Sequence, residues 1–254
     1  MSEIIADAII DAGTLQQYVD VFTPLVAEGR IHFNDDGITT AVCDSANVAM
    51  IAPGRLDAAA FESYDAPGAA TIGVSFDTLS ERLGAANSGD LVRLRVDMET
   101  RKLKLDYRNI SQSVGMIDPD AIRQDPDTPD IDLPNTMTVE AGALDEAATV
   151  IDMVTDHLGI DARPDDREVA LIGQGDIDDT EVVFGDEETI SADVPEDTWS
   201  LFSLEYVEEL IDPMPADAEV TLTFGDEFPM LLDWEACEGR LTVHQMLAPR
   251  IESE

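Results

Sequence analysis

The feature that most constrains the fold is an internal repeat, because the second half of the chain repeats the pattern of the first. Each half reads as a strand, a helix, several strands, a short helix and a final run of strands. The best-matched positions, about 130 residues apart, are Leu79, Leu83 and Leu94 in the first half and Tyr206, Leu210 and Leu222 in the second. The sequence therefore predicts one supersecondary unit built twice.

A proline-rich stretch separates the two copies. Residues 118–134 read DPDAIRQDPDTPDIDLP, and Arg123 is their only cation. Proline fixes φ and has no amide donor, so this stretch is neither a helix interior nor a central strand. We therefore expect a pair of domains, 1–117 and 135–254, joined by an extended connecting loop over 118–134.

Apolar periodicity gives the elements of each half. Helical spacing predicts helices over 14–26, 76–86, 143–158 and 204–214, the first with Thr14 as its N-cap. The run NDDG at 34–37 predicts a hairpin turn. Strands that follow one another through hairpins imply antiparallel sheets, with both helices of a copy on one face. The fold class is α+β, in two tandem copies of an antiparallel sheet with two helices.

The charge of the chain is extreme and evenly spread. It has 14 Lys and Arg against 55 Asp and Glu, a net charge of −41, and only 44% of its residues are hydrophobic. Such dispersed acid is typical of a halophilic protein, because at molar salt the Debye length is only about 3 Å and self-repulsion is screened. The alternative is an acidic protein that mimics or binds a basic partner.

No targeting signal or membrane segment is recognised. No apolar run approaches the roughly 20 residues of a membrane helix, and the N-terminus MSEIIADAII lacks a basic region. We expect a soluble, cytoplasmic protein with no membrane partner. Cys43 and Cys237 lie far apart without a CxxC pair, so we interpret them as ordinary thiols in strands.

No motif requires catalysis. His32, His157 and His244 have no metal-ligand spacing, and no phosphate loop or nucleophile elbow is present. The acidic run 176–181 lacks the glycine and terminal glutamate of a calcium-binding loop, so it is interpreted as an acidic turn. We expect no enzyme, no catalytic residue, no cofactor and no bound metal. A carboxylate-based, metal-dependent hydrolase stays as an alternative that requires acids to converge in one pocket.

Several short blocks of the sequence carry a resemblance to a known family. They are DSANVAM (44–50), FESYDA (61–66), TIGVSFDTL (71–79), LFSLEYVEEL (201–210), GDEFPMLLDW (225–234) and the closing LAPRIE (247–252). In this order, on a duplicated chain with a proline-rich connector, they resemble the PCNA type of DNA polymerase sliding clamp. The acidity is typical of an archaeal, and specifically a haloarchaeal, member of that family.

The resemblance implies a function without catalysis. Three subunits would join head to tail into a closed ring, a heterologous interface whose rotation closes. Helices would line a channel that encircles duplex DNA without sequence specificity. As a processivity factor in DNA replication and DNA repair, the homotrimer would tether DNA polymerase, flap endonuclease, ligase and other clients, and a clamp loader would open it. A checkpoint-type subunit of a hetero-oligomeric ring is the alternative.

The resemblance also implies three sets of site residues. The client-peptide pocket would use Cys43, Val48, Met50, Thr128, Pro129, Ile131, Leu133, Pro229, Met246, Leu247, Ala248 and Pro249. The DNA-facing channel would use Gln16, Gln17, Thr23, Glu81, Arg82, Glu146, Thr149, Glu205, Glu208 and Asp212. The subunit interface would use Ser111, Ser113, Gly115 and Ile117 of one edge strand against Thr180, Val182 and Phe184 of another.

The channel set departs from the family pattern. Family members usually carry Lys and Arg at these positions, whereas here Arg82 is the one cation. Basic residues gain little in molar salt, because with six phosphate contacts a tenfold rise in salt lowers affinity by roughly 10⁵ through lost counterion release. We therefore expect a polar to acidic channel in which monovalent or divalent cations and water screen the phosphates, while the closed ring holds the DNA by topology.

Overall fold

The computed structural model describes residues 4–250 of the 254-residue chain. It is a mixed fold of short helices and antiparallel strands, so the predicted α+β class is confirmed. The helices are α1 (Ala12–Asp20), α2 (Phe76–Leu83), α3 (Ala141–Asp152) and α4 (Leu204–Ile211). Within the described residues no helix is long and apolar enough to cross a membrane.

The chain divides into two compact units. Unit 1 comprises Met1–Cys43, Ile51–Asp127 and Cys237–Val243, and unit 2 comprises Asp44–Met50, Thr128–Ala236 and His244–Glu254. The domain bounds expected from the sequence, 1–117 and 135–254, stay a prediction; their ends at 1–3 and 251–254 lie outside the described residues.

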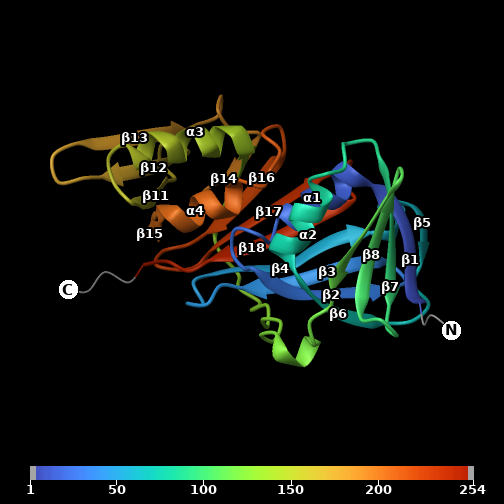
Figure 1. The fold of residues 1–254 in the computed structure, drawn as a ribbon. Coiled ribbons are helices and arrows are strands. Elements are labelled where there is room, and N and C mark those ends of the chain that lie inside the picture. Colours follow the sequence, from blue (N-terminus) through green and yellow to red (C-terminus); the bar gives the residue numbers. More distant parts are fainter. Residues whose placement is uncertain (1–3, 251–254) are drawn as a thin grey trace. The chain divides into compact units, whose positions relative to one another are not determined.

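Unit 1 contains a five-stranded antiparallel sheet in the order β5-β1-β7-β8-β9 (Figure 1). Its strands are β1 (Ile4–Asp11), β5 (Phe61–Asp65), β7 (Leu91–Asp97), β8 (Lys102–Tyr107) and β9 (Ile110–Gly115). Side chains alternate across it: Val92, Leu94 and Val96 of β7 are buried, whereas Arg93 is exposed. This period of two is why LVRLRV forms a strand with one face on the core.

The second sheet region of unit 1 runs in the order β4-β3-β2-β6. Its strands are β2 (Glu28–Asn34), β3 (Gly37–Cys43), β4 (Ala49–Asp57) and β6 (Ala70–Ser75). The predicted hairpin turn is confirmed, because Asn34 pairs with Gly37 between β2 and β3. Helices α1 and α2 lie side by side (Figure 1). The buried rings of Phe22 and Phe76 stack with their centroids 5.2 Å apart, and Tyr18 contacts Phe22 in an edge-on arrangement at 5.1 Å.

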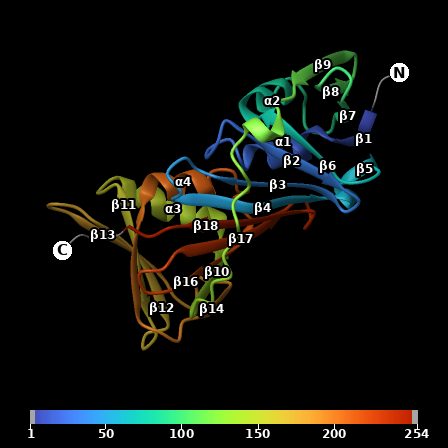
Figure 2. The ribbon, with the colours of Figure 1, turned by 90° about the horizontal axis from the view of Figure 1, so that it is seen from below.

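Unit 2 repeats this plan. One sheet has the order β13-β12-β11-β15, and a second region runs β14-β10-β16-β17-β18 (Figure 2). The strands are β10 (Asn135–Glu140), β11 (His157–Arg163), β12 (Glu168–Gln174), β13 (Asp179–Phe184), β14 (Ser191–Asp193), β15 (Thr198–Ser203), β16 (Glu219–Phe224), β17 (Met230–Ala236) and β18 (Leu241–Leu247). Helices α3 and α4 pack together over an apolar core that includes Leu144, Ile151, Val207 and Leu210.

Several helix boundaries differ from the prediction, and α1 ends at Asp20, six residues before the predicted end at 26. Helix α1 begins at Ala12, because Asp11 is its N-cap and its carboxylate accepts from the Thr14 amide at 3.0 Å; Thr14 as the cap was wrong. Helix α3 ends at Asp152, so Leu158 lies in β11 and not on the helix. The Leu158 side chain is nevertheless buried, because alternate side chains of a strand face the core and Leu158 is one of them.

Candidate functional site

The turn Asp44–Met50 of unit 2 is organised by one carboxylate. Asp44 is 5% exposed, and its oxygens accept from the backbone amides of Ala46 at 2.6 Å, Val48 at 2.6 Å and Ala49 at 2.8 Å. The Tyr206 hydroxyl of α4 donates a further hydrogen bond to Asp44 at 3.0 Å. The DSANVAM motif is therefore an ordered turn, in which the Asp44 carboxylate accepts the hydrogen bonds of backbone amides that have no backbone acceptor in the turn.

The protonation of both partners follows from this contact. Burial acts to raise the pKa of Asp44, but the hydrogen bonds from the three backbone amides and from Tyr206 outweigh it, so the pKa is lowered. Burial, together with the hydrogen bond to Asp44, raises the pKa of Tyr206 to about 12. At neutral pH the pair is a carboxylate that accepts and a hydroxyl that donates.

The C-terminal segment lies beside this turn. The Ala248 amide donates to the Val48 carbonyl at 2.8 Å, and the Arg250 amide donates to the Leu201 carbonyl of β15 at 2.7 Å. Met246, Ala248 and Pro249 are partly exposed, as are Val48 and Met50. Leu247 is fully buried and offers no surface to a partner. The structure thus brings Val48 together with the closing segment of the predicted pocket.

A second apolar surface lies at the turn between β16 and β17. Phe228 is 53% exposed, next to the partly exposed Pro229. A Cβ on the preceding Gly225 would lie 3.2 Å from both Leu133 Cδ2 and Pro134 Cδ, so the end of the connector packs closely there. Phe228 was missed by the sequence reasoning; its signal was an aromatic residue inside the acidic turn GDEFP.

For the remaining predicted pocket residues the structure gives their exposure, and it does not assign them to a common pocket. Thr128 and Pro129 are exposed and Ile131 is partly exposed in the connecting loop. Cys43 is buried at the end of β3 in unit 1. Their membership in a client pocket stays a prediction.

The outer face of α3 and α4 is acidic. Glu146, Thr149, Glu205 and Asp212 are exposed. Burial and the nearby carboxylates of Asp152, Asp145 and Glu205 raise the pKa of Glu208, which is also on this face. The acids are therefore close enough to repel one another. Among residues 4–250 no group of three or more His, Cys, Asp or Glu is arranged to hold a metal ion.

The outer face of α1 and α2 in unit 1 is polar. Gln16 and Gln17 are partly exposed. Thr23 lies beyond the end of α1, and its hydroxyl donates to the Asp20 carbonyl at 3.2 Å. Arg82 of α2 pairs with the adjacent Glu81 at 3.3 Å. The one cation of the predicted channel set is therefore already partly neutralised.

Both predicted interface strands are sheet edges. Strand β9 ends the five-stranded sheet of unit 1, and β13 ends the four-stranded sheet of unit 2. Ser111, Ser113 and Gly115 are exposed on β9, whereas Ile117 lies beyond it and bridges to Gly73. Thr180 and Val182 of β13 are partly exposed and Phe184 is buried. Each edge presents backbone groups that no strand of the described chain pairs.

The two edges differ in charge. A large share of the 14 cations lies on β7, β8 and their turns: Arg93, Arg95, Arg101, Lys102, Lys104 and Arg108. Acids on the same face partly neutralise them, as in the pairs Arg93–Asp7 at 2.5 Å and Lys104–Asp97 at 2.6 Å. Around β13 the exposed charges are acidic: Asp176, Asp178, Asp179 and Glu181, of which Glu181 pairs with Arg163 of β11.

Comparison with known sequences gives consistent results. Residues 5–118 match the family model described as proliferating cell nuclear antigen, N-terminal domain. A DNA polymerase sliding clamp of Natronomonas pharaonis is 40% identical over 247 residues, covering 97% of this chain and 99% of the relative. One of Haloarcula marismortui is 41% identical over 248 residues, covering 98% and 99%.

Comparison with solved structures extends this to the fold. The structure of the C-terminal region of FEN-1 bound to A. fulgidus PCNA matches with a TM-score of 0.91 and 30% identity, over 98% of this chain and 100% of that one. PCNA from Thermococcus kodakaraensis matches in fold with a TM-score of 0.88 at 21% identity, over 96% and 100%.

Proposed function

Because the chain belongs to the proliferating cell nuclear antigen family and is a DNA polymerase sliding clamp, not an enzyme, we propose that three copies of it close into a ring around duplex DNA. The observation that carries this proposal is the pair of open edges, β9 in unit 1 and β13 in unit 2. An edge strand is a template for pairing with another chain. Two different edges on one chain give a head-to-tail contact, which forms a ring when its rotation closes.

Charge complementarity supports this pairing. In a chain of net charge −41, most pairs of surfaces repel each other. The exposed Lys102 of β8 makes the β9 side the exception, and the exposed Asp179 of β13 supplies the opposite sign. Such a contact fixes which edge meets which, because β9 against β9 or β13 against β13 juxtaposes like charges.

The channel proposal rests on the helices. If α1 to α4 line the ring, DNA faces Gln16 and Gln17 on one unit and Glu146, Glu205 and Glu208 on the other. Phosphates then meet polar and acidic groups, and cations and water lie between them. The ring stays on DNA by topology, which salt does not screen.

Retention on DNA tests this proposal. The clamp is loaded on nicked circular DNA, and its dissociation is followed as KCl is raised from about 0.1 M to 2 M, where the Debye length falls from about 10 Å to below 3 Å. We expect the clamp to persist on circles in molar salt and to leave when the circle is linearised. Loss from intact circles with rising KCl would contradict topological retention.

We assign client binding to the surface formed by Val48 and Met50 with Met246, Ala248 and Pro249, together with the connector residues Pro129 and Ile131. The A. fulgidus PCNA structure that this chain resembles holds the C-terminal region of FEN-1, a peptide client. Polymerase, flap endonuclease and ligase would use the same surface, and a clamp loader would supply the ATP that opens the ring. The clamp itself needs no cofactor.

Two substitutions test the client surface. Met246→Ala removes partly exposed apolar area, and Pro129→Gly makes the connector more flexible. We expect each to weaken binding of a client peptide while the oligomer keeps its mass. Peptide affinity equal to that of the wild type in both variants would remove the pocket assignment.

A further inference from the structure

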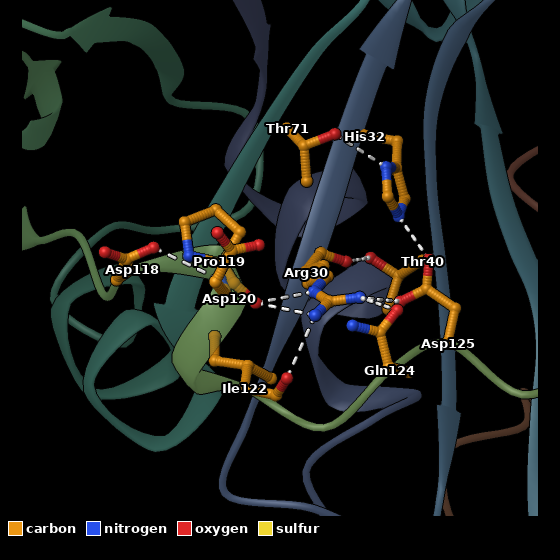
Figure 3. A network of polar contacts seen from close by, with 10 residues as sticks. All are labelled: Arg30, His32, Thr40, Thr71, Asp118, Pro119, Asp120, Ile122, Gln124 and Asp125. Atoms are coloured by element: carbon orange, nitrogen blue, oxygen red, sulfur yellow. Dashed lines mark hydrogen bonds and ion pairs between the residues drawn. The ribbon is translucent and has the colours of Figure 1, made fainter.

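The first half of the connector is held by a buried arginine. Arg30 of β2 is only 8% exposed. Its Nε and Nη2 donate to the Pro119 carbonyl at 2.9 Å and 2.6 Å, and Nη2 also donates to the Ile122 carbonyl at 2.9 Å (Figure 3). Its Nη1 donates to Gln124 Oε1 at 3.4 Å and lies 3.7 Å from Asp125 Oδ1. One guanidinium thus binds the segment at four successive places.

A histidine on the same strand holds the end of that segment. His32 Nε2 lies 2.7 Å from Asp125 Oδ2, and Nδ1 lies 2.9 Å from Thr71 Oγ1 of β6 (Figure 3). A neutral ring with its proton on Nε2 donates to the carboxylate and accepts from the hydroxyl, so both contacts are satisfied at once. Arg30 and His32, both on β2, therefore bind the same segment of the connector.

Apolar packing completes the attachment. The Ile117 amide donates to the Gly73 carbonyl of β6 at 2.8 Å, and Ile122 is 5% exposed. A Cβ on Gly73 would lie 2.5 Å from Ile122 Cδ1, so the isoleucine occupies the space that a side chain at position 73 would fill. This close approach is the reason for a glycine inside β6.

The attachment ends at Asp125. Residues 127–130 are all exposed, and Ile131 is only partly buried. The connector therefore has two parts that differ in exposure: a docked part, residues 119–125, fixed to β2 and β6, and a more exposed part that begins at Pro126 and carries Pro129 and Ile131. Proline spacing alone did not distinguish them, because prolines occur in both parts.

We propose that Arg30 and His32 are positioning residues for client binding, which act by fixing residues 119–125 and so anchoring one end of the connector segment that carries Pro129 and Ile131. This proposal rests on the proposed client surface. A docked start restricts the backbone conformations of the residues that follow it, so fewer conformations must be lost when a client orders them. The buried guanidinium is shielded from solvent ions, so the attachment also works in molar salt, where exposed pairs are screened.

Trypsin tests the docked state directly. Arg123 is the only tryptic site of the connector, and it lies inside the docked part. Cleavage after Arg123 requires that part to open, so its rate follows the open population. We expect Arg30→Gln to raise the rate of this cleavage at least about tenfold in molar KCl. Arg55→Gln, which removes an exposed cation paired only within β4 to Asp57, should leave the rate unchanged.

A second variant separates docking from folding. Asp125 is partly exposed, so Asp125→Ala removes the contacts to His32 and to Arg30 Nη1 while the backbone contacts of Arg30 and the core stay in place. We expect a smaller but clear acceleration of cleavage with unchanged thermal unfolding. If both Arg30→Gln and Asp125→Ala are cut after Arg123 at the wild-type rate, the docked part does not exist in solution and the proposal is overturned.

Client binding is then measured with a fluorescent peptide that carries a clamp-binding motif. If the docked form is populated about a tenth of the time in Arg30→Gln, the apparent affinity falls about tenfold, while Arg30→Lys recovers part of it and the oligomer keeps its mass. Wild-type protein that binds no peptide contradicts the proposed client surface. Wild type that binds, with Arg30→Gln binding equally tightly, overturns the positioning role alone.

Discussion

The Asp44–Tyr206 contact gives the sharpest stability prediction. In Asp44→Asn one carboxylate oxygen becomes an amide nitrogen, which cannot accept a hydrogen bond. The oxygen Oδ1 accepts from Val48 at 2.6 Å and Ala49 at 2.8 Å, and Oδ2 accepts from Ala46 at 2.6 Å and Tyr206 at 3.0 Å. In either orientation, the amide nitrogen of the new side chain would therefore face two donors that have lost their acceptor. Losing two hydrogen bonds to a buried charge, at 1.5–3 kcal/mol each and with some relaxation, destabilises the fold by about 3 kcal/mol.

The expected effect is a fall in the unfolding temperature. For a chain of this size, 1 kcal/mol corresponds to about 2–4 °C, so Asp44→Asn should unfold roughly 6–12 °C lower in molar KCl at pH 7. Tyr206→Phe removes a single hydrogen bond and should lower it by about 2–4 °C. Asp217→Asn, the same change at an exposed position, should have no measurable effect.

The pH dependence follows from the lowered pKa of Asp44. A depressed pKa stabilises the fold above the unfolded-state value of about 3.9, and this stabilisation is lost as the pH falls through the folded-state value. The gap between wild type and Asp44→Asn should thus be full at pH 7 and shrink below about pH 4. Equal unfolding temperatures at pH 7, or a gap that grows in acid, would refute the assignment of Asp44 as a buried, ionised acceptor.

Two further predictions concern charge and packing. Burial and neighbouring acids raise the pKa of Glu208, so its ionised form is unfavourable; Glu208→Gln should stabilise the protein by about 0.3 kcal/mol at 0.1 M KCl and by less at 2 M, as thermal unfolding in the two salts measures. Gly73→Val should displace Ile122 and the backbone at Ile117, whose carbonyl oxygen would lie 2.8 Å from the new Cβ, and should therefore accelerate tryptic cleavage after Arg123.

The periodic features of the fold could be predicted from the sequence. The duplicated pattern and the alternation in LVRLRV depend only on local spacing, and the buried Phe76, Leu79 and Leu83 follow from a helical period. Helix ends were harder, because the cap of α1 depends on a carboxylate that reaches back along the chain from Asp11. The helical spacing also gave a wrong assignment for Leu158, because this apolar residue of β11 happens to continue the spacing of the preceding helix.

The site was predictable only where a motif marks it. DSANVAM marked the segment that begins at Asp44 only through the family resemblance, and nothing in the spacing indicated a turn organised by Asp44 or its contact with Tyr206 of α4. The Arg30 contacts join positions far apart in the chain, and an arginine in a strand gave no signal of burial. Such contacts depend on tertiary approach, which neither propensity nor period encodes.

The acidity of the chain links these observations. With a net charge of −41, few exposed surfaces of this chain can attract one another. The attractive contacts that the chain does have are either buried, like those of Arg30, or supplied by a local concentration of cations, like the one around β8. In the proposed ring, topology would hold the DNA in the same way, because it requires no attraction that salt can screen.

The mass of the assembly in molar KCl tests the central claim most directly. Sedimentation equilibrium at about 2 M KCl, where the Debye length is below 3 Å, removes most repulsion between copies. We predict a single species with three times the mass of one chain. Lys102→Glu, at an exposed position of the β8–β9 edge, should weaken this assembly. A monomer that persists at every protein concentration would contradict the closed homotrimeric ring and favour a subunit that assembles with different chains.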